Sequence, residues 1–99
     1  MPSSTVEFHE AAAADYDAAF DWYLERSPDA ALRLAAEVER ALEQILSAPK
    51  RWAVSSFQTR RFLLRRFPLM LVYREREGRI QVLAVAHTSR KPEYWKNRI

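Results

Sequence analysis

The sequence predicts an α+β fold with the element order β-α-α-β-β-β, in which a helix hairpin packs on a mainly antiparallel four-stranded sheet. Two observations predict it. Hydrophobic residues recur every three or four positions between residues 10 and 47, and every second position between residues 60 and 87. The 99 residues suffice for one small hydrophobic core. We therefore expect a single domain over residues 1–99.

The first half of the chain predicts one strand and two helices. Residues 5–8 alternate apolar and polar side chains, as a strand does, and residues 10–26 show the spacing of a helix. Ser27-Pro28-Asp29 then supplies an N-cap, a proline for the first helical position and an acid for the first turn. The second helix ends at Ser47-Ala48-Pro49. So short a connection between helices predicts an antiparallel hairpin.

The second half predicts a loop and three strands. Residues 50–59 form the loop, and residues 60–67 the first strand, which Pro68 ends. Residues 69–76 are the next strand, with Leu71 and Tyr73 on one face and Met70 and Val72 on the other.

The last strand follows a hairpin turn at Glu77-Gly78-Arg79, where the only glycine of the chain can take a positive φ. Residues 80–87 form this strand, and its run 82–86 is apolar on both faces, which predicts a central strand.

Charge divides the chain into two halves. Residues 1–49 carry ten acids and three arginines, a net of −7, whereas residues 50–99 carry thirteen bases and three acids, a net of +10. This asymmetry suggests a polyanionic partner for the basic half, although basic strands that only aid solubility are the alternative. We expect the uncovered sheet face and its rim to be positively charged.

Several functional classes are excluded by composition. The chain has no cysteine, so it has no disulfide, thiolate metal site or cysteine nucleophile. The single glycine excludes phosphate-binding glycine loops, and the two histidines, His9 and His87, lack a metal-ligand spacing. We expect no metal and no cofactor. No apolar run could span a membrane and Met-Pro-Ser-Ser-Thr is no signal peptide, so we expect a cytoplasmic protein.

Basic and aromatic residues gather in two segments of the second half. Arg60-Arg61 and Arg65-Arg66 lie in one predicted strand, where Arg61 and Arg65 project to one side and Arg60 and Arg66 to the other. The chain after the last strand adds His87, Arg90, Tyr94, Lys96 and Arg98. Arginine matches phosphate oxygens and tyrosine can stack on a base. Alternatively, His87 completes a buried strand, and Tyr94 and Trp95 pin the tail.

Cleavage of RNA at its 2′-hydroxyl is one chemistry that these residues allow. His87 or Tyr94 could act as base or acid, while Arg61 and Arg90 could hold the phosphate. The residues permit this mechanism and do not require it.

The ordered motifs resemble the RelE/ParE superfamily of type II toxin–antitoxin toxins, in its ParE-like, plasmid-stabilisation branch. The matching pieces are Val6-Glu7-Phe8-His9, Trp22-Tyr23, Ala48-Pro49-Lys50-Arg51-Trp52, residues 61–68, Leu71-Val72-Tyr73, residues 82–87 and Arg90-x-Pro92-x-Tyr94-Trp95. The resemblance implies a bacterial growth inhibitor that a cognate antitoxin neutralises. RelE-like members cut mRNA in the ribosomal A site, whereas ParE-like members inhibit DNA gyrase without being nucleases.

The RelE-like catalytic pattern is only partly present. Met70 and Thr88 stand where that pattern has arginines, and Leu63 where it has a lysine. The positions that match are Arg61, Arg90 and Tyr94. Loss of an arginine that neutralises a transition-state phosphate weakens the nuclease hypothesis, and His87 at the end of the run Val82-Leu83-Ala84-Val85-Ala86 is more typical of ParE-like members.

We therefore expect a gyrase inhibitor rather than an enzyme. The alternatives are a ribosome-dependent mRNA endoribonuclease and a non-toxic relative that only binds an antitoxin. The catalytic residues of a nuclease would be Arg61, Arg90, Tyr94 and His87. The expected target-binding residues are Arg60, Arg65, Arg66, Lys96 and Arg98, and the expected antitoxin-binding residues are Tyr16, Phe20, Tyr23 and Trp52. We expect operator DNA to be contacted only through the antitoxin, because both helices are acidic.

Overall fold

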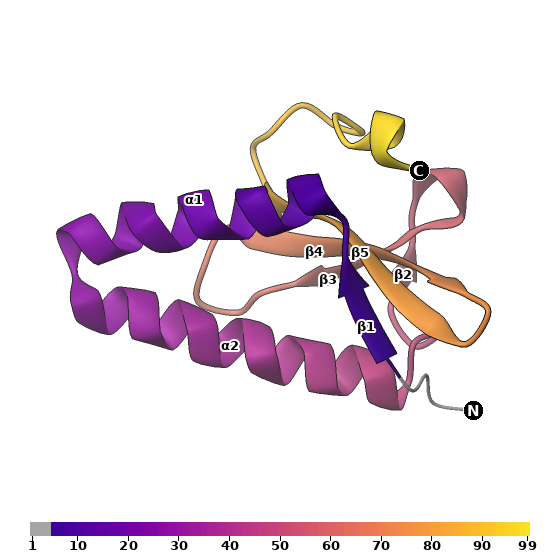
Figure 1. Ribbon diagram of the computed structural model, residues 1–99, viewed down its shortest axis with the longest axis horizontal. Coiled ribbons are helices and arrows are strands. Elements are labelled where there is room, and N and C mark those ends of the chain that lie inside the picture. The colour runs from indigo at the N-terminus through magenta and orange to yellow at the C-terminus, as the bar shows by residue number, and fades with distance from the viewer. Residues whose placement is uncertain (1–4) are drawn as a thin grey trace.

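The computed structural model describes residues 5–99, in which two helices pack on a five-stranded sheet (Figure 1). The elements are β1 (Thr5–Phe8), α1 (Glu10–Arg26), α2 (Pro28–Ser47), β2 (Ala53–Val54), β3 (Arg60–Leu63), β4 (Leu69–Arg76) and β5 (Arg79–His87). The strand order is β1-β5-β4-β3-β2, with only the β1–β5 pair parallel. The predicted fold class is confirmed, and β5 is a central strand.

Ser27 caps both helices of the hairpin, as the C-cap of α1 and the N-cap of α2. Its backbone N–H donates to the Tyr23 carbonyl of α1 at 2.7 Å, and its hydroxyl accepts the Ala30 N–H of α2 at 3.2 Å. Pro28 occupies the first turn of α2, where its missing N–H costs nothing. The helices therefore run antiparallel, as predicted (Figure 1).

The main core lies between the helices and the sheet. Leu34 and Ile45 of α2 are fully buried, as are Leu71 and Tyr73 of β4 and Ile80 of β5. Burying each aliphatic side chain of this size contributes about 2 kcal/mol. The predicted alternation of β4 is confirmed, because Met70 and Val72 lie on the opposite face of the sheet.

The opposite face is partly covered, which corrects the expectation of an uncovered, positively charged sheet face. A bulge pairs Val72 with Ala84 and Tyr73 with Val82, which leaves Leu83 as the extra residue. The chain after β5 returns over this face, and Trp95, only 3% exposed, packs on Val72 and Leu83. Apolar packing therefore occupies the centre of this second face.

Two predicted boundaries were wrong. The predicted strand over residues 60–67 ends at Leu63, and the Leu64 N–H closes a loop on the Leu69 carbonyl at 2.9 Å. Arg65 and Arg66 therefore lie in a loop and do not project alternately from a strand. The predicted loop over residues 50–59 contains the two-residue strand β2, which raises the strand count from four to five.

The predicted hairpin turn between β4 and β5 is confirmed. Glu77 has a φ of 51° and Gly78 a φ of 75°. Two successive residues with positive φ match the backbone twist of an antiparallel hairpin.

Candidate functional site

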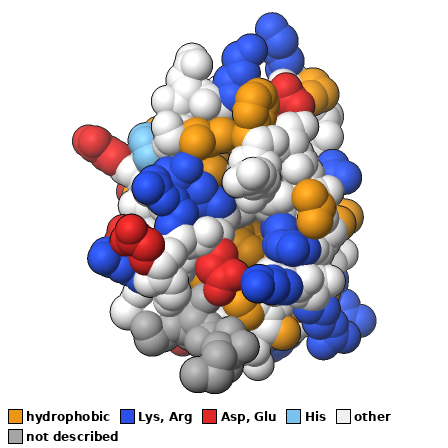
Figure 2. All heavy atoms as spheres, turned by 90° about the vertical axis from the view of Figure 1, so that its right-hand side faces the viewer, with side chains coloured by type: hydrophobic (Ala, Val, Ile, Leu, Met, Phe, Trp, Pro, Cys, Tyr) orange, Lys and Arg blue, Asp and Glu red, His pale blue; other side chains and the backbone are white. Residues whose placement is uncertain are grey.

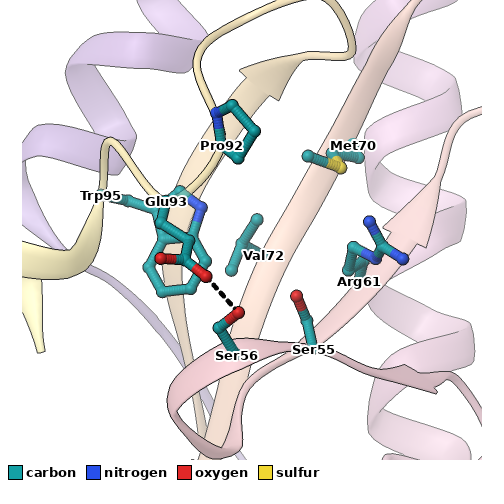
Figure 3. A pocket seen from close by; sticks show the side chains of 8 residues that line it. All are labelled: Ser55, Ser56, Arg61, Met70, Val72, Pro92, Glu93 and Trp95. Carbon is teal, nitrogen blue, oxygen red and sulfur yellow. Dashed lines mark hydrogen bonds between the residues drawn. The ribbon is translucent and has the colours of Figure 1, made fainter.

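A pocket of about 510 Å³ lies on the face of the sheet opposite the helices (Figure 3). We call it the sheet-face pocket; its lining is Ser55, Ser56, Arg61, Met70, Val72, Pro92, Glu93 and Trp95. Figure 3 shows Arg61 on one side, Glu93 and Trp95 on the other, and Val72 between them. The Glu93 carboxylate accepts a hydrogen bond from the Ser56 hydroxyl. The pocket can hold one anionic group at Arg61, but Met70 supplies no second cation.

A second concavity, of about 400 Å³, lies between α1 and the adjoining ends of β4 and β5. We call it the α1 groove; its lining is Asp15, Ala18, Ala19, Trp22, Tyr23, Pro68, Leu69, Val85, His87 and Arg90. Most of these side chains are apolar, and Trp22 is 52% exposed. The groove therefore combines an aromatic anchor with the cation of Arg90.

The predicted catalytic residues are only partly brought together: His87 and Arg90 both line the α1 groove, whereas the register of the sheet separates Arg61 from His87. Arg61 is directly opposite Val72, which belongs to the face covered by Trp95. His87 is opposite Leu69, which belongs to the core under the helices. Directly paired residues share a face, so Arg61 and His87 lie on opposite faces of the sheet. His87 is exposed, and its Nδ1 lies 2.7 Å from the Ser89 hydroxyl in a local turn.

An ion pair covers the edge of β5 beyond the end of β1. The Val85 N–H donates to Asp15 of α1 at 3.1 Å, and the Leu83 carbonyl accepts from Arg98 at 2.9 Å. Asp15 and Arg98 are themselves 2.7 Å apart, with side chains 15% and 16% exposed. This pair satisfies backbone groups that a further strand would otherwise bind.

Tyr94 belongs to the same arrangement. Its hydroxyl donates to Asp15 at 3.1 Å, and the guanidinium groups of Arg90 and Arg98 lie 4.0 and 5.0 Å from its ring centre. Burial, with the Asp15 carboxylate, raises the pKa of Tyr94 to about 12. A phenol whose proton is held this tightly is a poor general base near neutral pH.

The predicted target-binding residues fall into two groups. Arg60 donates to the carbonyls of Lys50 and Trp52 at 3.0 and 2.7 Å, and Arg98 is held by Asp15, so these two hold the chain itself. The others, Arg65, Arg66 and Lys96, are exposed. Figure 2 shows that basic side chains are scattered over the face of the molecule that looks right in Figure 1, between hydrophobic and uncharged patches. Their role in target binding stays a prediction.

The predicted antitoxin-binding aromatics are half-buried against the main core. They are Tyr16, Phe20, Tyr23 and Trp52. The ring of Tyr23 packs edge-on against that of Phe67, with the ring centres 5.0 Å apart. The rings of Trp52 and Phe62 pack in the same way, with their centres 4.5 Å apart. Each therefore serves the fold, and a further role in antitoxin binding stays a prediction.

Sequence reasoning missed Asp15 and Trp22. Asp15 lies three residues after Ala12 and four before Ala19, within the buried stripe of α1, and an acid in that position was the available signal. Trp22 carried no such signal, because its exposure depends on how α1 meets the ends of β4 and β5.

Two features are absent from residues 5–99. This part of the chain holds no cluster of three or more His, Cys, Asp or Glu side chains that could bind a metal ion. Its helices are also not long and apolar enough to cross a membrane.

Comparison with known proteins points to one family. The family described as the ParE toxin of the type II toxin–antitoxin system parDE matches residues 6–92. A solved chain of the chromosomal ParDE toxin–antitoxin system from P. aeruginosa shares the fold, with a TM-score of 0.73 and 24% identity over 86% of this chain and 96% of that one. No curated protein matches the sequence.

Proposed function

The chain belongs to the ParE toxin family of type II toxin–antitoxin systems, and we propose that it stops growth by binding DNA gyrase, without cleaving a nucleic acid itself. One observation carries the choice between binding and cleavage. Arg61 and His87 lie on opposite faces of the sheet, and the Tyr94 hydroxyl donates to Asp15. Cleavage needs a base, an acid and phosphate-binding cations at one point. The α1 groove holds only His87 and Arg90 of the predicted set, while Arg61 lies on the other face and Asp15 holds the Tyr94 proton. This incomplete set supports inhibition by binding. We further propose that the protein acts in the cytoplasm.

A supercoiling assay tests the proposal directly. Purified chain added to gyrase and relaxed plasmid should abolish supercoiling in a dose-dependent way. Full gyrase activity at saturating chain would overturn the proposal. Primer extension on translated mRNA, run beside it, detects the alternative, because a ribosome-dependent nuclease would leave A-site cuts.

Lys96 is the candidate target contact in the C-terminal segment. Its side chain is exposed, and reversing its charge disturbs no contact of the fold. Lys96→Glu should raise the concentration for half-inhibition of gyrase at least fivefold, whereas Lys50→Glu, an equal charge change at another exposed lysine, should leave it unchanged. Equal effects of the two substitutions would show that only net charge matters.

The family also supplies the partner, since a ParE toxin is neutralised by an antitoxin. We propose that a C-terminal antitoxin segment wraps this chain and inserts an apolar side chain into the α1 groove beside Trp22. Two features support this: the half-exposed indole and the adjacent Arg90, which an acidic residue could meet. Tyr23 lines the groove itself, and the partly buried Tyr16, Phe20 and Trp52 would then bind the segment outside it.

Calorimetric titration with the cognate antitoxin tests this surface. Trp22→Ala should weaken binding at least tenfold, because interface tryptophans that fill apolar grooves carry much of the binding energy. Leu32→Ala is the control, since Leu32 is 65% exposed on α2 and lies outside the groove. Unchanged affinity of Trp22→Ala would place the antitoxin elsewhere.

A further inference from the structure

A cleft of about 490 Å³ lies between α2 and the loop that joins β3 to β4. We call it the four-arginine cleft, because Arg33 and Arg40 of α2 face Arg65 and Arg66 of the loop across it. Arg33, Glu37 and Arg40 follow one another at helical spacings of four and three residues, so they share one face of α2. Figure 1 shows the loop beside α2, away from the C-terminal segment.

Glu37 fixes the geometry of the cleft. Its carboxylate accepts the backbone N–H of Arg65 at 3.2 Å and that of Arg66 at 3.0 Å. The only acid in the lining is therefore used to dock the loop on the helix. The seven residues of the lining carry four positive charges and one negative charge, a net of +3 that equals the formal net charge of the whole chain.

The four guanidinium groups lack internal partners. Within residues 5–99, no hydrogen bond, ion pair or ring contact engages the side chain of Arg33, Arg40, Arg65 or Arg66. Four cations beside a single carboxylate give the cleft a positive potential. An external anion would be attracted to it and would use donors that the fold leaves unused.

The dimensions of the cleft suit an extended anion. Arg33 and Arg40 are seven residues apart on α2, which is about 10 Å along the helix axis, so their charges are spread along the cleft unless both side chains converge on one point. A nucleic-acid strand presents several phosphates over that distance.

The apolar content of the cleft argues against a peptide. Ala36 and Phe67 are its only apolar side chains, and the Phe67 ring is already packed on Tyr23. Acidic peptide segments generally use apolar anchors as well as charge, and the chain offers those in the α1 groove. A cleft with cations and no free anchor suits a phosphodiester backbone, which is contacted through charge and hydrogen bonds and needs no apolar anchor.

We propose that the four-arginine cleft binds the phosphate backbone of nucleic acid, with no preference for base sequence. This goes beyond gyrase inhibition: the chain itself contacts DNA, from α2 and the adjoining loop. It leaves open the expectation that operator DNA is contacted only through the antitoxin, because the proposed contact reads no base sequence.

Fluorescence anisotropy with a labelled duplex of random sequence tests the proposal without gyrase or antitoxin. The chain should bind at low salt, with an affinity that falls as salt rises. Arg65→Gln/Arg66→Gln should weaken binding at least tenfold and reduce the slope of log affinity against log salt by about two, since each lost phosphate contact removes about 0.9. The matched control is Arg76→Gln/Lys91→Gln, which removes the same charge from exposed side chains outside the cleft.

Two results would overturn the proposal. The first is equal weakening by both double variants, which would assign binding to net charge. The second is loss of antitoxin affinity in Arg65→Gln/Arg66→Gln with DNA binding intact, which would make the cleft a protein-binding site. Both substitutions spare the backbone N–H groups that Glu37 binds, and unchanged thermal unfolding confirms that the loop is retained. Gyrase inhibition is measured in its own assay, so a failure of the nucleic-acid proposal is distinguishable from a failure of the gyrase proposal.

Discussion

The carboxylate of Asp15 joins three segments that are distant in the sequence. It accepts hydrogen bonds from the Val85 N–H of β5 and the Tyr94 hydroxyl, and it pairs with Arg98 near the C-terminus. A largely buried charge is stable only where its partners replace the water that it lost. Among the acids of α1, Asp15 therefore has a structural role.

Asp15→Asn should lower the free energy of unfolding by about 2 kcal/mol, since it leaves the Arg98 guanidinium without its counter-charge in a mostly buried site. Asp17→Asn, an exposed neighbour on the same helix, should change it by less than about 0.5 kcal/mol. Urea unfolding followed by circular dichroism measures both. Equal effects of the two substitutions would contradict a special role for Asp15.

Two tyrosines make stability sensitive to alkaline pH. Burial raises the pKa of Tyr73 and of Tyr94 to about 12, above the ordinary 10. Between pH 10 and 12 the folded chain keeps protons that the unfolded chain has lost, so stability is full below pH 10 and falls as pH rises through that window. Unfolding free energies measured from pH 8 to 12 should show this decline, and Tyr94→Phe should make it shallower. A flat profile across the window would contradict the assignment.

At the scale of elements, local signals predicted most of the fold. The strand at residues 5–8, both helices and the turn at Gly78 were correct, because each depends on residues within a few positions of one another. The early end of β3 was missed, since it is set by Glu37, nearly thirty residues away. The strand β2 was missed because two residues are too few to show a period.

The candidate sites show the same limit. The sequence supplied Arg61, His87 and Arg90, but their distribution over two faces follows from strand register and from the bulge at Leu83. The four-arginine cleft could not be predicted from the charge pattern. Two of its arginines come from the acidic half of the chain and two from the basic half, and only the fold brings them together.

Glu37→Ala tests the docking of the β3–β4 loop on α2. It removes the acceptor of two backbone N–H groups, and because these are exposed to solvent the cost should be about 1 kcal/mol. Glu39→Ala, two residues along the same helix and exposed, should cost less than about 0.5 kcal/mol. Hydrogen exchange should also accelerate at Arg65 and Arg66 in the first variant only. Unchanged protection there would show that the loop is held by other contacts.

For the molecule as a whole, the chain after β5 completes the fold. The helices cover one face of the sheet, and the C-terminal segment covers the other with Trp95 while its Arg98 covers the edge of β5. The same segment carries Arg90 beside the α1 groove and the exposed Lys96. Substitutions in this segment therefore affect stability and binding together, unless they are confined to its exposed residues.

Trp95→Ala should show how much of the molecule depends on this cover. Loss of a large buried aromatic costs about 3–5 kcal/mol, a large part of the 5–15 kcal/mol that stabilises a domain of this size. Phe57→Ala is the control. The Phe57 ring packs on Trp95, with the ring centres 6.2 Å apart, but it is 53% exposed, so its loss should cost less than about 1 kcal/mol. Thermal and urea unfolding of both variants, with binding of a hydrophobic dye, measure the difference. If Trp95→Ala unfolds at the wild-type midpoint, the second face of the sheet is stable without its cover.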